Sequence, residues 1–303
     1  MRWFENPSYN ITGNRYIAYI FSGVMVLASL IGIFGYGLEY GIDFKGGKSF
    51  VLQFDQPIEV TEIRAELTEP LGGAPEVKIF GSDREILIRT DNPNAINVVQ
   101  DIITSALAKA YPENDAMVIR TDVVGPRFAE DLKRGALNAT IFAVVAIFLY
   151  ILVRFKDWRF STGAVVALTH DVLVVLGIIT IFREILPFSL EIDQTIIAAL
   201  LTIVGYSIND TVVIFDRIRE NLQRHKGMDY EELINKSTNE TLSRTVITSL
   251  TTLFVVAVLF FFGGQVLKGF SFSLILGIIF GTYSSIFIAS SLALDLEKND
   301  VNK

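Results

Sequence analysis

Asp210 and its neighbour Asn209 lie inside a long apolar segment, residues 196–215. A carboxylate at membrane depth costs about 3 kcal/mol or more, so membrane proteins keep one mainly where it faces protein or water and helps to move ions or protons. We therefore predict that Asp210 belongs to an intramembrane proton or ion path. The other residues assigned to this path are Asn209, Arg244, Asp171, His170 and Thr248. The alternative is a static buried ion pair.

Arg244 opens the next apolar segment along the chain. A helical rise of 1.5 Å per residue places Asp210 about 22 Å, and Arg244 about 27 Å, from the outer ends of their segments. These depths differ by about one helical turn, so we predict an ion pair between neighbouring helices, in which each charge needs the other at low dielectric. The alternative for Arg244 is that its long side chain extends to the inner membrane interface.

Other polar and small residues occur at similar depth. His170 and Asp171 lie mid-membrane in a third segment; a titratable imidazole suits a proton relay, and a structural hydrogen bond remains the alternative. Thr248 belongs to a hydroxyl stripe at helical spacing, which we expect to face the same interior. Helix packing alone also accounts for these hydroxyls and for the small residues that let helices approach closely. The stripe and the predicted packing glycines are Thr241, Thr245, Thr248, Thr252, Gly205, Gly277 and Gly281.

Six segments are long and apolar enough to cross a membrane. Apolar residues make up 51% of the chain and the mean hydropathy is +0.45, so we predict an α-helical polytopic membrane protein with six transmembrane helices. The segments are 16–38, 137–153, 163–182, 195–215, 245–263 and 270–294.

The distribution of Lys and Arg predicts the orientation, because short cytoplasmic loops are enriched in them. With the N-terminus inside, the short outer loops hold only Arg183 and Lys268, and both termini are cytoplasmic. We divide the chain into an N-terminal segment with the first helix (1–38), an outer domain with its connector (39–134), a five-helix region (135–294) and a cytoplasmic tail (295–303). The five-helix region includes a cytoplasmic loop at 216–242, which we expect to be helical with a break at Gly227. The basic residues assigned to the inner side are Arg2, Arg15, Arg154, Lys156, Arg159, Arg217, Arg219, Arg224, Lys226, Lys236, Lys298 and Lys303.

The insertion after the first helix, about residues 39–127, is expected outside the cytoplasm. Its strand-like and helix-like patterns alternate as βαββαβ, which predicts a ferredoxin-like α+β domain with one small core. Residues 81–83 are expected to form the turn of the central hairpin. The six predicted elements are 49–55, 60–71, 76–81, 85–90, 95–110 and 116–124.

Composition narrows the function classes. The insertion carries fifteen Asp and Glu against nine Lys and Arg, and an acidic surface argues against nucleic acid as a partner. The absence of cysteine excludes thiolate chemistry and disulfides. We find no nucleotide-binding loop, metal-ligand cluster or nucleophile with its base, so we expect no enzymatic activity, no cofactor and no metal.

Several strings together resemble the SecF family of the bacterial SecD/SecF export complex, within the resistance-nodulation-division superfamily. The likeness covers the whole chain and follows the order of the family's motifs. The strings are GIDFKGG (41–47), VGP (124–126), THDV (169–172), GYSINDTVVIFDRIREN (205–221), NETLSRTVITSLTTL (239–253) and GTYSSIFIA (281–289).

This resemblance implies a multi-pass subunit of the bacterial inner membrane that works with SecD, the SecYEG translocon and associated insertase components. It would promote export of polypeptides at the expense of the proton-motive force. The family's proton-path aspartate and arginine match Asp210 and Arg244, and the insertion would be periplasmic. The alternatives are half of a proton-driven exporter of small molecules or lipids, and a non-transporting membrane scaffold. Coupling to sodium instead of protons stays open.

Overall fold

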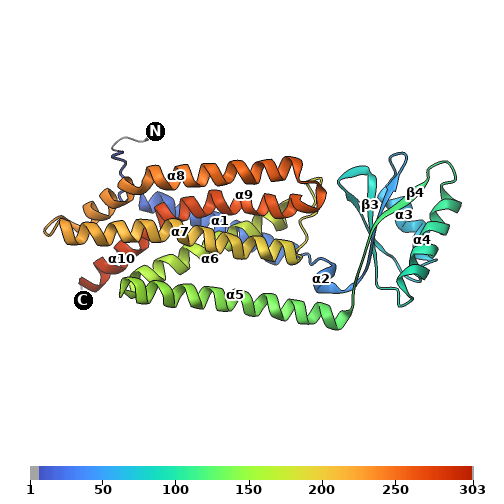
Figure 1. Ribbon diagram of the computed structural model, residues 1–303, viewed down its shortest axis with the longest axis horizontal. Helices are drawn as coiled ribbons and strands as arrows, with labels where there is room; N and C mark the ends of the chain where they lie inside the picture. Colours follow the sequence, from blue (N-terminus) through green and yellow to red (C-terminus); the bar gives the residue numbers. More distant parts are fainter. Residues whose placement is uncertain (1–6, 302–303) are drawn as a thin grey trace. The chain divides into compact units, whose positions relative to one another are not determined.

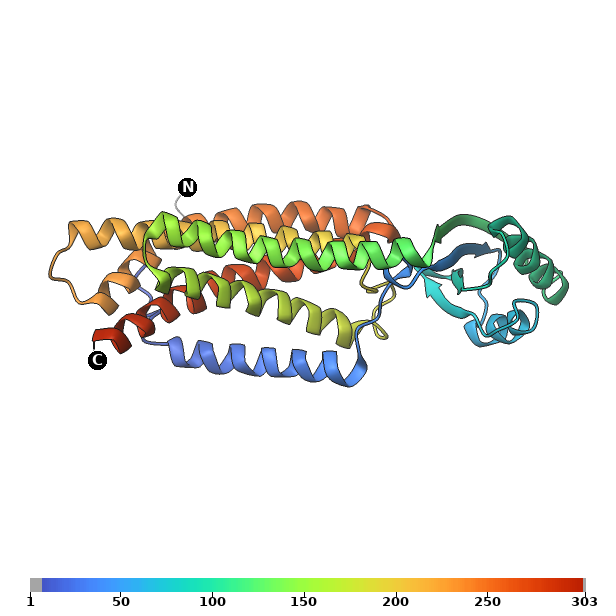
Figure 2. The ribbon, with the colours of Figure 1, turned by 90° about the horizontal axis from the view of Figure 1, so that it is seen from below.

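The computed structural model describes residues 7–301, and the side chains of residues 7–297. Of the basic residues used for orientation, Arg2, Lys298 and Lys303 lie outside the described side chains. The chain forms two compact units, of which the first comprises Met1–Leu38, Asn138–Ile181 and Thr195–Lys303, and the second Glu39–Leu137 and Phe182–Gln194. Figures 1 and 2 show the helices of the first unit and the sheet of the second.

The first unit is a helical bundle, and the predicted number of six candidate membrane-crossing helices is confirmed in the described part of the chain. The sixth candidate span consists of two α-helices, α9 and α10, joined by a π-helical turn, η1. The helices are α1 (Arg15–Tyr36), α5 (Pro126–Phe155), α6 (Trp158–Phe182), α7 (Gln194–Arg224), α8 (Tyr230–Phe262), α9 (Gln265–Ser284), η1 (Ser285–Ala289) and α10 (Ser290–Val301).

Several helices extend beyond their apolar segments. Helices α7 and α8 continue through most of the polar stretch predicted as a helical cytoplasmic loop, leaving a short link in which Gly227 has a φ of 111°. Positive φ suits glycine, which has no Cβ, so the predicted break at this residue is confirmed. Helix α5 begins at Pro126, a residue favoured in the first helical turn, and runs without interruption into the second span.

Close helix contacts place α1 against α6. A Cβ added to Gly177 of α6 would lie 2.2 Å from the Ser29 side chain of α1, and one added to Gly32 of α1 would lie 2.6 Å from Ile181. Tyr283 of α9 donates a hydrogen bond to the Ala18 carbonyl at 2.9 Å. Helix α1, blue in Figure 2, therefore packs along α6 and along the segment formed by α9, η1 and α10.

The second unit contains a four-stranded antiparallel sheet with strand order β2-β3-β1-β4. The predicted alternation of strands and helices is present. A core of fully buried side chains, including Phe50, Phe54, Ile63 and Ile103, packs the sheet against α3 and α4. The elements are α2 (Ile42–Lys45), β1 (Gly47–Phe54), α3 (Val60–Thr68), β2 (Glu76–Phe80), β3 (Ser82–Thr90), α4 (Ile96–Ala110) and β4 (Ala116–Val124).

The predicted three-residue turn at 81–83 is wrong. Ser82 already belongs to β3 and pairs with Phe80, so Gly81 alone separates the strands, with a φ of 90°. A backbone conformation open chiefly to glycine makes this one-residue reversal feasible. Ser82 and Asp83 are residue types common in turns, but here both belong to β3.

Loop 182–194, between α6 and α7, belongs to the same unit as the sheet. Tyr40, in the segment that follows α1, forms a bridge with Ile192 of this loop. The Ile192 amide donates to the Glu39 carbonyl at 2.7 Å, and the Gly41 amide donates to the Ile192 carbonyl at 2.9 Å. Backbone hydrogen bonds thus join two segments more than 140 residues apart in the sequence.

Candidate functional site

Asp171 of α6 lies at the centre of a polar network and is fully buried. Ser207 of α7 donates to its Oδ2 at 2.7 Å, and Ser284 of α9 donates to the same oxygen at 2.8 Å. His170 Nδ1 is 3.0 Å from Oδ1. Three helices thus supply partners to one carboxyl group, as a buried polar group requires.

The π-helical turn η1 gives this network a second layer. Ser285 donates to the Ser207 carbonyl at 3.2 Å, and its hydroxyl lies 2.9 Å from that of Thr211. A π-helical turn widens a helix locally and occurs often at functional sites. A Cβ at Gly281 would approach the Ser207 Cβ to 3.0 Å and the Asp171 Oδ2 to 3.5 Å. Small residues thus let α9 approach the carboxylate closely.

Asp210 of α7 is also buried, with 3% of its surface exposed. Its described hydrogen-bond partner is Ser249 of α8, which donates to Oδ2 at 3.4 Å. The Ser249 hydroxyl also lies 2.6 Å from that of Thr282 on α9. Asp210 therefore has a thinner polar environment than Asp171.

The predicted ion pair between Asp210 and Arg244 is not formed. None of the ion pairs in the described part of the chain joins these two residues, and Arg244 is exposed, although its charge acts on Asp210. Ser249, which does reach Asp210, follows Arg244 by five residues, and five residues turn a helix by about 140° beyond a full turn. Arg244 therefore points away from the face of α8 that meets Asp210.

The remaining predicted proton-path residues differ in position. His170 is buried beside Asp171, Asn209 is exposed on α7, and Thr248 is half-buried on α8. Within the hydroxyl stripe, Thr241 and Thr252 donate to carbonyls of α8 itself. This back-bonding is a common way for helical threonines to satisfy a hydroxyl, so these two support the packing alternative.

Two of the three predicted packing glycines have close neighbours. A Cβ at Gly277 would lie 2.2 Å from Ile203 of α7, and the approach at Gly281 is described above. Gly205 is exposed, and a Cβ there would meet nothing within 4 Å. The packing prediction for Gly205 therefore has no support within this chain.

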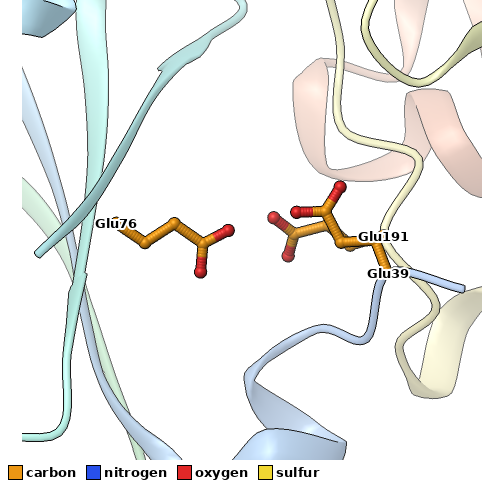
Figure 3. A group of neighbouring side chains, drawn as sticks. All are labelled: Glu39, Glu76 and Glu191. Carbon is orange, nitrogen blue, oxygen red and sulfur yellow. The ribbon is translucent and has the colours of Figure 1, made fainter. Parts of the chain in front are cut away.

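A second charged cluster, which the sequence patterns did not indicate, lies in the unit that contains the sheet. Carboxylate oxygens of Glu39, Glu76 and Glu191 all lie within 4.8 Å of one another, and Figure 3 shows the Glu76 carboxylate pointing toward the other two. Lys78 Nζ contacts all three residues, at 3.1 Å from Glu76 and 3.2 Å from Glu191. Arg89 bonds Glu76 at 3.0 Å and Glu191 at 2.5 Å.

This arrangement of charges favours a network of internal ion pairs over a metal site. The Lys78 ammonium already supplies the positive charge that a metal ion would bring to the three carboxylates, and Arg89 supplies a second. Burial raises the pKa of Glu76, but Arg89 and Lys78 outweigh it and lower that pKa to about 2. Burial lowers the pKa of Lys78, but its hydrogen bond to Glu39 and the charge of Glu191 outweigh it, so the pKa is raised.

Sequence reasoning missed most partners of these groups. Ser207 and Ser284 had a signal, since hydroxyl residues inside apolar segments are candidates for interhelical hydrogen bonds. Glu39 and Glu191 carried no such signal, because an acidic residue in a loop is ordinary. Their contact depends on folding that brings distant loops together.

The chain matches a family model described as "Protein export membrane protein SecD/SecF, C-terminal" over residues 103–299, and one described as "SecD/SecF GG Motif" over residues 31–58. It is 56% identical over 296 residues to a protein of Rhodothermus marinus named "Protein translocase subunit SecF", covering 98% of this chain and 96% of that protein. A protein of the same name from Thermodesulfovibrio yellowstonii is 43% identical, covering 96% and 95%.

A solved structure of SecDF from Thermus thermophilus, described as a translocon-associated membrane protein, is similar with a TM-score of 0.85 and 37% identity. The match covers 98% of this chain and 40% of the SecDF chain. A SecDF structure in a super-membrane-facing form has a TM-score of 0.71 and 33% identity, covering 99% of this chain and 40% of that one.

Proposed function

Because the chain belongs to the SecD/SecF family of protein export membrane proteins, we propose that it couples the proton-motive force to protein export as a partner of SecD. The family and the six apolar helices indicate a multi-pass membrane protein with an accessory role in Sec translocation. The proton coupling and the residues that perform it are the proposal.

The observation that carries the proposal is the pair of buried carboxyl groups at membrane depth, Asp171 and Asp210, on adjacent helices. Retaining one such group is expensive, and intramembrane acids usually mark ion or proton pathways. Here there are two, and hydroxyl groups from α7, α8 and α9 surround them.

In the proposed cycle, protonation changes which helix arrangement is favoured. An apolar environment within the bundle favours the neutral carboxyl group, whereas a nearby cation or water favours the carboxylate. Arg244 is the cation proposed to approach Asp210 when α7 and α8 move. A membrane potential adds about 2.3 kcal/mol per elementary charge per 100 mV, which is enough to bias a two-state element.

The partner assignment has its own support. Gly205, Asn209 and Arg244 are exposed on α7 and α8 within the candidate spans. An arginine and an amide facing lipid are costly, and small residues in membranes typically allow another helix to pack closely. We assign this surface to SecD, and the complex would act with the SecYEG translocon, associated insertase components and the exported polypeptide.

We also assign the sheet unit to the periplasm and both termini to the cytoplasm, as the charge distribution predicts. For this unit we propose the split-βαβ, ferredoxin-like arrangement, which the strand order β2-β3-β1-β4 and the helices between β1 and β2 and between β3 and β4 support. This fold supports many functions and does not specify one.

Proton uptake by vesicles containing the SecD complex of this chain tests the proposal. We expect Asp210→Asn and Asp171→Asn each to reduce uptake and translocation driven by an imposed proton gradient to background, while the complex still assembles. Thr169→Ala is the control, because this exposed hydroxyl donates to the Val165 carbonyl of its own helix and to no other group in the described part of the chain. Wild-type translocation by both Asn variants would contradict proton coupling and favour a scaffold.

A further inference from the structure

Loop 182–194 connects α6 to α7, the two helices that carry the buried aspartates. Glu191 in this loop bonds Arg89 of β3 at 2.5 Å and Lys78 of β2 at 3.2 Å. The side chains of Arg89 and Glu191 are only 9% and 8% exposed. Ion pairs, one of them buried, therefore attach the sheet to the connection between these two helices.

The backbone provides a second attachment for the same loop. Ile192 forms the bridge to the segment after α1, and the Gln194 amide donates to Asp43 Oδ2 of α2 at 3.0 Å. Gly46 alone separates α2 from β1. A sheet held only through this short connection could turn about it, so the ion pairs to β2 and β3 are the contacts that fix its orientation on the loop.

The charges of this ion-pair network balance. Figure 3 shows its three carboxylates, which face the two cations of β2 and β3, and the Arg183 guanidinium lies 3.6 Å from one of them. Removing one partner of a buried pair leaves the other charge uncompensated, which is strongly destabilising. We therefore expect the network to stay closed while helices move. Its members are Glu39, Glu76, Lys78, Arg89 and Glu191.

The two titratable groups on β2 also resist a change of pH. Burial opposes both shifts, but the surrounding opposite charges lower the pKa of Glu76 to about 2 and raise that of Lys78. Both groups keep their charges in the weakly acidic and neutral range, so a proton gradient does not open the network by titrating them. The charged groups that face these two are Lys45, Arg89, Glu39 and Glu191.

We propose that the ion-pair network is a permanent mechanical coupling, through which a displacement of the connection between α6 and α7 moves the sheet as one rigid body. The proposal rests on the proposed proton coupling and adds the element that transmits it to the sheet. Glu191 acts as a positioning residue, because it holds β2 and β3 on the loop. The sheet itself binds no proton in this cycle and follows the helices that do.

Comparing proton uptake with translocation in the same vesicles tests the coupling. In vesicles holding the SecD complex, we expect Glu191→Gln to keep proton uptake within about twofold of wild type but to lower translocation about tenfold or more, because a buried pair loses one charge. Glu184→Gln is the matched control, since this residue of the same loop has a 75% exposed side chain. A structural role alone would lower both readouts or neither, and either result would overturn the proposal.

A cross-link tests whether the network stays closed, because the chain has no cysteine of its own. The double variant Lys78→Cys with Glu191→Cys removes both charges and should show the same split between uptake and translocation. A short bifunctional maleimide, with the link verified by mass spectrometry, should then restore translocation, and Glu191→Cys alone with the same reagent should not recover.

No recovery in the linked double variant would mean that the network must open, and would overturn the permanent coupling. If wild-type vesicles take up no protons while the link still restores translocation, the proposed function fails and the mechanical coupling stands.

Discussion

Asp171 and Asp210 have different surroundings although both are buried carboxyl groups. Asp171 accepts hydrogen bonds from two serines and contacts an imidazole. Among the described residues, Asp210 has one long hydrogen bond, from Ser249, and the charge of Arg244 acts on it without an ion pair. Asp171 is therefore held in place by its neighbours. Asp210 has fewer contacts to lose when helices move, which suits the group proposed to change partners.

The Glu76 carboxylate makes the stability of the sheet unit depend on pH, with a sign that follows from its pKa. Its pKa is about 2 in the folded chain against a reference value of 4.5, so the unfolded state binds more protons in this interval. The stabilisation is complete above about pH 4.5 and is lost as the pH falls toward 2. Amide hydrogen-exchange protection factors of β2 and β3, measured on the full chain, should therefore decrease between pH 5 and pH 3.

Glu76→Gln is the control for this prediction. The variant keeps the side-chain size but removes the charge, so its protection at pH 7 should be lower and its further loss on acidification smaller. A variant with the same pH profile as the wild type would show that the cluster does not depend on Glu76.

At the scale of elements, α7 and α9 approach each other because Gly277 leaves room for Ile203. A methyl group at Gly277 would lie 2.2 Å from Ile203 Cγ1, a distance that forces one helix to shift. Overpacking of this kind typically costs about 1–3 kcal/mol. Gly277→Ala should therefore destabilise the full chain in detergent, seen as a lower thermal unfolding midpoint by circular dichroism.

Gly205→Ala is the matched variant, because Gly205 lies in α7 and has open space at its Cβ. In the isolated chain it should be neutral or stabilising by about 0.5–1 kcal/mol, since alanine is the better helix former. An equal loss of stability in both variants would mean that the contact with Ile203 is not the cause.

At the scale of the whole molecule, several spans keep most of their surface unburied. Within the apolar windows of α5 and α8, only 6% and 17% of residues are buried. Apolar side chains on such faces suit lipid or another membrane helix. The exposed polar residues of α7 and α8 distinguish the face assigned to SecD from faces that lipid can cover.

A photoreactive probe on Asn209→Cys tests that assignment. In membranes containing both subunits, we expect a cross-link to SecD from this position and none from Leu27→Cys, a 59% exposed position on α1. Mass spectrometry of the adducts identifies the partner. Lipid adducts alone from Asn209→Cys would contradict the assigned interface.

The six helices, the alternation of strands and helices in the insertion, and the acidic residues within the spans could all be predicted from the chain's residues and their order. Hydropathy and side-chain periodicity are local properties of the sequence, so they can be evaluated without knowledge of the fold. The apolar flanks of Asp210 predicted its place within a membrane-crossing segment, and it lies in α7, one of the candidate spans.

Which side chains contact one another depends on how the helices and loops pack. Helical rise gives the depth of Asp210 and Arg244 but says nothing about how each helix is rotated against its neighbours, and rotation turns Arg244 outward. The hydroxyl groups around Asp171 come from residues 36 and 113 positions away in the chain. The cluster of Glu39, Glu76 and Glu191 likewise joins two loop residues with strand β2, because packing, and no local pattern, brings these charges together.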